Sequence, residues 1–413
     1  MSQKTRQIAG VCLVLGWLIQ THLGAVTLAE AYQAALKKNA QKTLTQEQLT
    51  QQKSTVQQLE AQNQFQASLT SSLRTNAQTS VSGKEDTTFT LGLSAGLLVD
   101  LWSKNKHQIA AAEHGYASIL SADQQQRLSI LSTVSEAFFN IILLEKTLAN
   151  QHTIETLVKK RLSQLQSWAT IGRSRQADVL ATQLQLQQLQ TALIQTQRQL
   201  DDAHTQLAYL TGFSDTVSVD SPKPSTPAPK PAWIEKAKRH PSLLTQQATL
   251  DALSEQLAAQ QANPLPDLGL SLVPQYIKNS TIDRFTWQIG GSMAFPLIDG
   301  GLNNAKITAL EASIRENKLV LANIQTAVQS NVDRAYRSYI SLKALQRSAS
   351  TAVTIAQKNY SSVLGEYELK LVTNVDVLQA LGMLYDALQT RDTALIQDHQ
   401  AQLQLQIAAG DSL

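Results

Sequence analysis

The chain has 413 residues, of which 5% are aromatic and 16% charged, and its net charge of +3 is close to balance. A chain so nearly neutral lacks the basic surface of a nucleic-acid-binding protein, so we expect no nucleic-acid partner. Its seven histidines show no metal-ligand spacing, and it has no Gly-rich phosphate loop or nucleophile motif. We therefore expect no metal, no cofactor and no enzymatic activity.

Residues 1–25 have the layout of a secretory signal peptide. Two basic residues precede an apolar run at 8–19, and small residues follow up to Ala25. The run is shorter than the roughly 20 residues that a membrane-spanning helix needs, so we favour cleavage near Ala25 over a membrane anchor. The single cysteine, Cys12, lies in this run, and the exported protein would therefore contain no disulfide. No later stretch reads as apolar enough for a transmembrane helix.

The first structural repeat, residues 26–220, combines helical and strand periodicity. Thr27 and Glu30 form a capping-box pattern at its start. The expected elements are a helix at 27–64, strands at 65–75 and 88–99 around a polar turn at 79–87, a long helix at 103–168, and, after a break at 169–175, a helix to 209. This order predicts a β-hairpin followed by a long helical hairpin.

A Pro-rich linker, residues 221–231, precedes a second structural repeat at 232–413. The linker could be a motif for a proline-binding partner, but its composition favours an extended spacer. The second repeat is predicted to contain a helix at 233–261, strands at 268–276 and 285–295 around a turn at 277–284, a helix ending at 367, a break at 370–374 and a helix at 375–409. Pro274 counts against the first of these strands.

The two repeats match at an offset of 198 residues, since Asp178-Val179-Leu180 recurs as Asp376-Val377-Leu378. At the end of each second strand, Leu98-Val99-Asp100 matches Leu297-Ile298-Asp299 at an offset of 199, so one residue of insertion or deletion separates the two matches, and a strand-to-helix turn follows. In the second repeat this turn contains Pro296, Asp299, Gly300 and Gly301. Proline ends the strand ladder, and the two glycines permit the positive φ that a sharp turn requires.

The four strands point to a membrane barrel. Each has about the length of a tilted strand that crosses a bilayer, with large apolar residues on one face and small or polar residues on the other. An ordinary half-buried sheet alternates in the same way, but the flanking helices are too long to fold over it. Four strands cannot close a barrel, and open edges are not tolerated in lipid. We therefore expect a mainly α-helical fold with a trimeric 12-stranded β-barrel, four strands per chain, continued by a long α-helical barrel.

Four short segments together resemble the outer membrane efflux protein family of TolC-like channels. They are Leu28-Ala29-Glu30-Ala31, the stretch from Phe295 to Gly301, Gly172 with Asp178-Val179-Leu180, and Tyr367 with Asp376-Val377-Leu378. The resemblance implies a homotrimer in outer-membrane lipid that extends into the periplasm. It also implies a passive exit duct for small molecules or protein in a tripartite efflux pump or type I secretion system.

The implied partners are a periplasmic adaptor (membrane fusion) protein and an inner-membrane pump or ABC exporter. An exported coiled-coil structural or adhesive protein without a pore is the alternative, but it leaves the four strands unexplained. The resemblance further implies that the two helical-hairpin tips form the periplasmic gate and dock the adaptor. The tip residues are Gly172, Arg173, Ser174, Arg175, Lys370, Leu371 and Thr373.

The gate itself is expected to involve Asp376 and Asp178, which begin the returning helices. In a trimer each becomes a ring of three carboxylates that favours cations, although a carboxylate in a first turn also simply complements the helix dipole. The chain departs from the family nearby. Gln379 replaces a second acidic ring, and Val372 replaces an arginine that helps to latch the gate. The entrance should therefore be less negative and differently latched.

Overall fold

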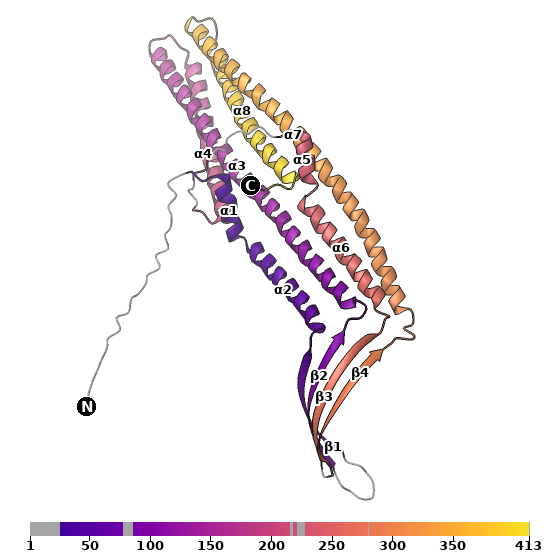
Figure 1. Ribbon diagram of the computed structural model, residues 1–413. Helices are drawn as coiled ribbons and strands as arrows, with labels where there is room; N and C mark the ends of the chain where they lie inside the picture. The colour runs from indigo at the N-terminus through magenta and orange to yellow at the C-terminus, as the bar shows by residue number, and fades with distance from the viewer. Residues whose placement is uncertain (1–24, 77–85, 215–217, 221–227, 280, 413) are drawn as a thin grey trace, which may run out of the picture.

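The computed structural model describes residues 25–412 except 77–85, 215–217, 221–227 and 280. The predicted signal peptide and most of the first polar turn and of the Pro-rich linker lie outside the described residues. Figure 1 shows a long helical bundle with a four-stranded sheet at one end and two helical-hairpin tips at the other. The sheet and the tips are thus separated by the length of the bundle.

The order of elements is the predicted one. The first repeat contains α1 (Leu28–Lys38), α2 (Ala40–Gln62), β1 (Gln66–Asn76), β2 (Asp86–Val99), α3 (Lys104–Thr170) and α4 (Gln176–Thr211). The second contains α5 (Lys230–Ala237), α6 (Pro241–Ala262), β3 (Asp267–Lys278), β4 (Asp283–Ala294), α7 (Leu302–Glu368) and α8 (Asn374–Ala408). Helices α3 and α7 have 67 residues each, which corresponds to about 100 Å.

Two predicted helices are each divided in two. The helix expected at 27–64 breaks at Asn39, whose backbone is extended (φ −69°, ψ 119°), and the helix expected at 233–261 breaks before Pro241. Proline is favourable in a first helical turn, where its missing N–H is not needed. For the same reason Pro231 lies inside α5, so this helix begins within the predicted linker. The capping box of Thr27 and Glu30 is present.

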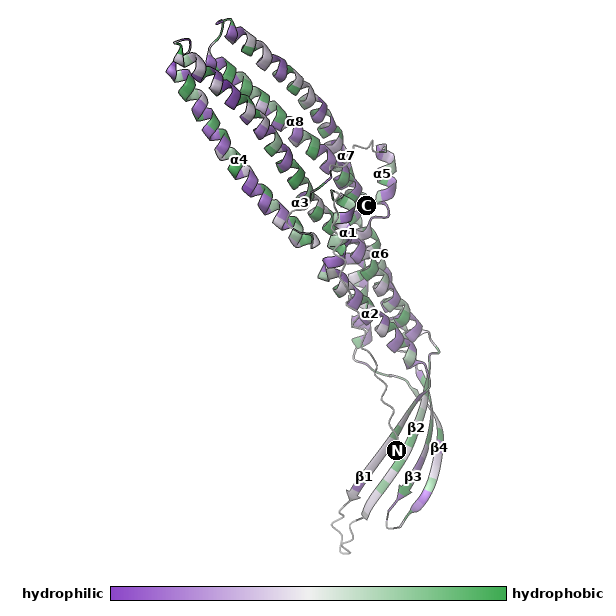
Figure 2. Cartoon of the chain, turned by 90° about the vertical axis from the view of Figure 1, so that its left-hand side faces the viewer, coloured by the Kyte–Doolittle hydropathy of each residue, from purple (hydrophilic) through white to green (hydrophobic). Residues whose placement is uncertain are grey.

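The register of the sheet places most of the large apolar residues of the four strands on one face. The sheet is antiparallel in the order β1-β2-β3-β4, and its cross-strand pairs include Leu69 with Leu93, Leu91 with Tyr276, and Leu272 with Ile289. Leu69 and Ile289 are each 71% exposed. Hydrophobic and polar residues alternate along the strands in Figure 2. A large uncovered apolar face of this kind is what lipid contact requires.

Pro274 lies in the middle of β3, although a proline there counted against the prediction of this strand. It pairs with Trp287 of β4, while the β2–β3 pairing is interrupted between Gly92–Gln275 and Ala95–Leu272. A proline cannot donate a ladder hydrogen bond, so the break falls where its N–H would have been used. The strand continues on both sides and ends at Lys278.

The hydrophobic core is built around α3. Near the middle of the bundle Tyr32 of α1 and Leu403 of α8 pack with Phe138 and Phe139 of α3. Within the described residues, α3 is the one helix with a window apolar enough to cross a membrane, so the expectation that no later stretch qualifies is wrong. Half of that window is buried inside the protein, because α3 packs on α1, α2, α4, α6 and α8.

The core contains one histidine that makes stability depend on pH. His399 is 5% exposed and its ring lies parallel to that of Phe139, with 6.3 Å between centroids. Burial lowers the pKa of His399 below its ordinary value of 6.5. The unfolded chain therefore takes up this proton first, and stability is lost as pH falls below about 6.5.

We expect His399→Phe to keep the ring packing and to reduce the loss of thermal stability between about pH 8 and pH 5. Melting temperatures of both proteins, followed by helical circular dichroism, measure the effect. His240, whose pKa is also lowered by burial, stays unchanged in both. Parallel pH profiles would show that His399 does not contribute.

Candidate functional site at the hairpin tips

The two tips share one backbone conformation. Gly172 follows α3 with φ 73°, and the next amide donates to the carbonyl of Trp168 over 2.8 Å. Lys370 follows α7 with φ 63°, and the next amide donates to the carbonyl of Glu366 over 2.9 Å. These are Schellman-type closures, in which a left-handed residue lets the helix end satisfy its own carbonyls. Lys370 therefore adopts in the second tip the backbone conformation that Gly172 adopts in the first.

Asp376 lies in the first turn of α8 and forms a capping box with Thr373. The N–H and the hydroxyl of Thr373 both donate to its Oδ2, over 2.7 and 2.6 Å. These bonds, the hydroxyl first, lower the pKa of Asp376 and keep it ionised. The matching position to Thr373 in the first repeat is Arg175, whose side chain makes no described cap on α4. The two tips therefore share a fold and differ in capping.

Asp178 lies at the contact between the hairpins. Its main-chain carbonyl accepts hydrogen bonds from the Thr182 hydroxyl at 2.8 Å and from the Asn374 side chain at 3.3 Å. Asn374 is 1% exposed and also donates to the hydroxyl of Thr182 over 3.0 Å. Of the two sequence-predicted replacements, Val372 is half-buried and Gln379 is exposed. The start of α8 is thus attached to the start of α4.

A buried arginine on α3 joins the same two hairpins. Arg161 is 4% exposed; its Nε donates to Oδ1 of Asn374 and its Nη1 to Gln164, each over 3.1 Å. The guanidinium lies 3.8 Å from the ring centre of Tyr367, which stacks on Trp168 at 6.0 Å. Burial lowers the pKa of Arg161, but an arginine stays charged in proteins. Its Nη2 has no hydrogen-bond partner among the described residues.

Sequence reasoning missed Arg161 because it looked for a latch at the position of Val372. A signal was present in α3, where buried positions recur at steps of three and four. Ile154, Val158 and Leu165 fill that stripe with apolar side chains, and Arg161 occupies the remaining position. A charge inside an apolar stripe is costly unless it has partners, so it points to a specific contact.

A second polar contact joins the hairpins closer to the middle of the bundle. Nδ2 of Asn150 on α3 donates to Oδ2 of Asp392 on α8 over 2.6 Å, and Asp392 is 2% exposed. Arg391 donates to the same carboxylate from its exposed side. One turn away, Thr147 donates to Gln389 over 3.1 Å. We call these α3–α8 contacts of Thr147, Asn150, Gln389 and Asp392 the intrachain seam.

The strand-to-helix turn lies at the opposite end of the bundle, after Pro296. Asp299 accepts from the amide of Asn303 at 2.8 Å and from that of Gly301 at 2.9 Å, and these bonds lower its pKa. Gly300 and Gly301 have φ of 62° and 85°. The matching residue to Gly301 before α3 is Ser103, which is also left-handed at φ 58°. The residue before each long helix is therefore left-handed in both repeats, although it is a glycine only in the second.

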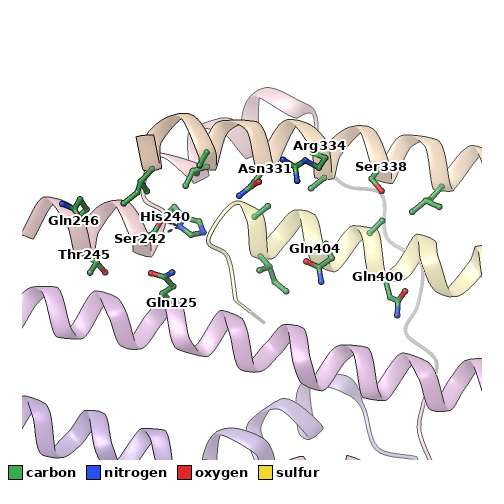
Figure 3. Close-up of a pocket in the computed structure, with 18 of the residues that line it drawn as sticks. Gln125, His240, Ser242, Thr245, Gln246, Asn331, Arg334, Ser338, Gln400 and Gln404 are labelled. Atoms are coloured by element: carbon green, nitrogen blue, oxygen red, sulfur yellow. Dashed lines mark hydrogen bonds between the residues drawn. The ribbon is translucent and has the colours of Figure 1, made fainter. Parts of the chain in front are cut away.

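A cavity of about 1000 Å³ opens where the start of α6 meets the end of α8, between α3 and α7. Figure 3 shows Gln125, His240, Arg334 and Gln404 around it, one from each of these regions. Amides and hydroxyls dominate the labelled lining. The cavity lies far from both tips and was not predicted from the sequence. The described residues include no group of acidic, histidine or cysteine side chains that could hold a metal.

The sheet, the bundle and the paired tips define a class: subunits of outer-membrane proteins in which a strand segment is continued by long helical hairpins. The family model described as "Outer membrane efflux protein" matches residues 61–213 and 234–411, and the chain belongs to this family. It is a family of channels rather than of enzymes, located in the outer membrane and extending into the periplasm.

Similar proteins agree with this assignment. The chain is 25% identical to the outer membrane protein TolC of Escherichia coli (strain K12) over 67% of this chain, but the match spans only 59% of TolC. The fold is similar to that of outer membrane protein VceC of Vibrio cholerae (TM-score 0.82, 19% identity, 93% of this chain and 96% of that one). It is also similar to the Campylobacter jejuni CmeC outer membrane channel (TM-score 0.80, 15% identity, 99% and 94%).

The shared tip conformation can be tested by exchanging its left-handed residues. A left-handed lysine is strained relative to glycine, so we expect Lys370→Gly to raise the free energy of unfolding by up to about 1 kcal/mol. Gly172→Ala should lower it by about as much. A Cβ at Gly172 would meet nothing within 4 Å, so its cost is purely one of backbone conformation. Urea unfolding measures both, and equal stabilities would contradict the strain.

Proposed function

We propose that this chain is one subunit of a homotrimeric channel. The observation that carries the proposal is the sheet: no other described residues cover its apolar face or pair with the outer sides of its edge strands β1 and β4. In lipid every backbone group needs a partner, so the edges must be closed by other copies. Three copies would supply 12 strands, within the range of outer-membrane barrels.

The helices would continue the barrel as a duct across the periplasm, since α3 and α7 are about 100 Å long. The duct would be the passive exit of a tripartite efflux pump or type I secretion system for small molecules or protein. An inner-membrane pump or ABC exporter would supply the energy through a periplasmic adaptor. The tips suit adaptor docking, since Ile171, Leu369 and Leu371 are 63%, 72% and 71% exposed beside Arg173 and Lys370.

The tips would also form the gate. Asp376 stays ionised in its capping box, so three copies would place a ring of negative charge near the entrance, with Asp178 as a second ring. Arg161 would hold the second hairpin against the first through Asn374 and Tyr367. The hairpin that carries Asp376 is the one that we expect to move when the gate opens.

We expect the purified protein to run as a trimer under native conditions and to conduct ions in planar bilayers. Divalent cations added on the tip side should reduce the conductance weakly, and Asp376→Asn should abolish that effect by removing the ring charge. Glu316→Gln, on the exposed surface of α7 far from the tips, is the matched control. A native monomer without conductance would contradict the channel and favour a structural coiled-coil protein. Block that survives Asp376→Asn would remove Asp376 from the gate.

Replacing Arg161 tests the latch. Arg161→Leu removes the donor to Asn374 and the stacking on Tyr367, so the second hairpin loses its attachment, and we expect a higher resting conductance. Arg315→Leu removes the same charge from the exposed surface of α7, far from the tips, and is the matched control. If both variants conduct like the unchanged protein while remaining trimeric, Arg161 does not restrain the gate.

A further inference from the structure

Each repeat contains a cavity where its returning helix ends beside the break between its two shorter helices. In the second repeat this is the cavity of about 1000 Å³ shown in Figure 3, and in the first repeat a cavity of about 460 Å³ lies between α1, α2, α3 and α4. The offset of 198 residues relates their walls: Gln126, Ser129, Ile130, Thr133, Tyr209 and Leu210 of the first correspond to Ile324, Ala327, Val328, Asn331, Ile407 and Ala408 of the second. The two cavities are therefore corresponding sites.

A lysine of the chain itself occupies part of the first cavity. The ammonium of Lys38 donates to the carbonyl of Ala208 over 3.1 Å and to that of Tyr209 over 2.5 Å. It also lies 5.5 Å from the centre of the Tyr209 ring. These carbonyls belong to the last turn of α4, so Lys38 satisfies a helix end that attracts positive charge.

No lysine among the described residues enters the second cavity in this way. His240 stands at the break between α5 and α6, as Asn39 does between α1 and α2. Burial lowers the pKa of His240, so its ring is neutral at pH 7. Gly410, with φ 79°, holds the chain end against this break, since a Cβ there would come within 2.9 Å of Cδ of Pro241. Backbone and an uncharged ring thus close this end, and no charged side chain fills the remaining volume.

Arg334 is the one residue that carries a charge at pH 7 among the described residues lining the second cavity. It is exposed on α7 and makes no ion pair with any described residue, whereas the adjacent Asp333 pairs with Lys230 over 2.9 Å. The corresponding residue of the first repeat is Glu136, which is also exposed. The repeats therefore carry opposite charges at this position, and the second cavity suits a negative group.

Uncharged polar groups surround Arg334 in the second cavity. Two amides tie its walls together, because Gln246 donates to Oδ1 of Asn317 over 2.8 Å and Gln404 donates to the hydroxyl of Ser132 over 3.2 Å. Other polar side chains of the lining make no hydrogen bond with described residues, namely Gln125, Asn331, Ser338, Gln397 and Gln400. They are available to a ligand within a wall that the first two amides hold in place.

The rest of the lining is apolar. Val328 is buried, and Ile324, Leu342 and Ile407 are half-buried. Small-molecule sites typically have volumes of about 300–1000 Å³, with mostly apolar walls and a few polar groups that fix the orientation of the ligand. The cavity has both the size and the mixed lining of such a site.

We propose that the second cavity binds a small amphipathic organic anion, with its carboxylate on Arg334, its polar atoms on the free amides and its apolar face on the aliphatic wall. A planar guanidinium can hold both oxygens of a carboxylate. A cation is disfavoured because the one charge present is positive. All lining residues belong to one chain, so the site does not depend on the proposed trimer.

Fluorescence titration of the full-length protein in its native assembly tests the charge. The probes are dansylglycine, which has an apolar ring and a carboxylate, and dansylglycinamide, which has the same ring without the charge. We expect one dansylglycine to bind per chain and the amide to bind about tenfold more weakly. Arg334→Gln should weaken dansylglycine by about the same factor and leave the amide unchanged. Arg337→Gln removes the same charge from an exposed position of α7 outside this cavity, so it should change neither.

A second pair of variants tests the location. Ala327 and Ser129 are exposed and occupy corresponding positions in the two cavities. Ala327→Phe places a ring in the second cavity and should weaken both probes about tenfold or more, whereas Ser129→Phe changes the first cavity and should have no effect. Binding that survives both Arg334→Gln and Ala327→Phe would overturn the proposal. So would equal losses from Arg334→Gln and Arg337→Gln, a preference for the amide, or no saturable binding.

Discussion

The need to pair every backbone N–H and carbonyl group of the sheet constrains the rest of the molecule. A strand in lipid cannot leave its N–H and carbonyl groups unpaired, and in the described part of this chain two strands, β1 and β4, have an open side each. All four strands carry apolar residues for contact with lipid, but four strands alone cannot close into a barrel. Closure has to come from other copies, and whatever symmetry closes the strands must also arrange the helices that continue from them.

The helices differ in chemistry between the contacts inside the chain and the outer flanks of the bundle. Inside the chain, polar groups at two levels, Asn150 with Asp392 and Arg161 with Asn374, tie the two hairpins together. On the outer flanks, the corresponding positions are apolar or neutral, and Asn359 stands where Arg161 would be repeated. Corresponding positions of the two repeats thus differ in chemistry, and the directional polar contacts lie where one chain joins its own two hairpins.

Most of the fold could be predicted because its periodicities are long and regular. Strand alternation and the 67-residue helices are strong local signals, and they gave the order of the elements. Helix breaks were less visible: Asn39 is compatible with a helix, although Pro241 could have marked the start of α6. The tip site was predicted only in its local part. The contact of Arg161 with Asn374 joins residues 213 positions apart, and no local pattern reports such a contact.

The equal length of α3 and α7 has a consequence for how such a sequence can change. Both helices run from a strand end to a tip, so their lengths fix how far each tip stands from the membrane. One residue inserted into either helix alone would shift its tip by about 1.5 Å and turn it by about 100°. The tips would then no longer be level, and the intrachain seam would present the wrong faces. Insertions should therefore survive only when they occur in both repeats, which keeps the tips level, and in steps close to whole pairs of helical turns, which keeps the same helix faces in contact.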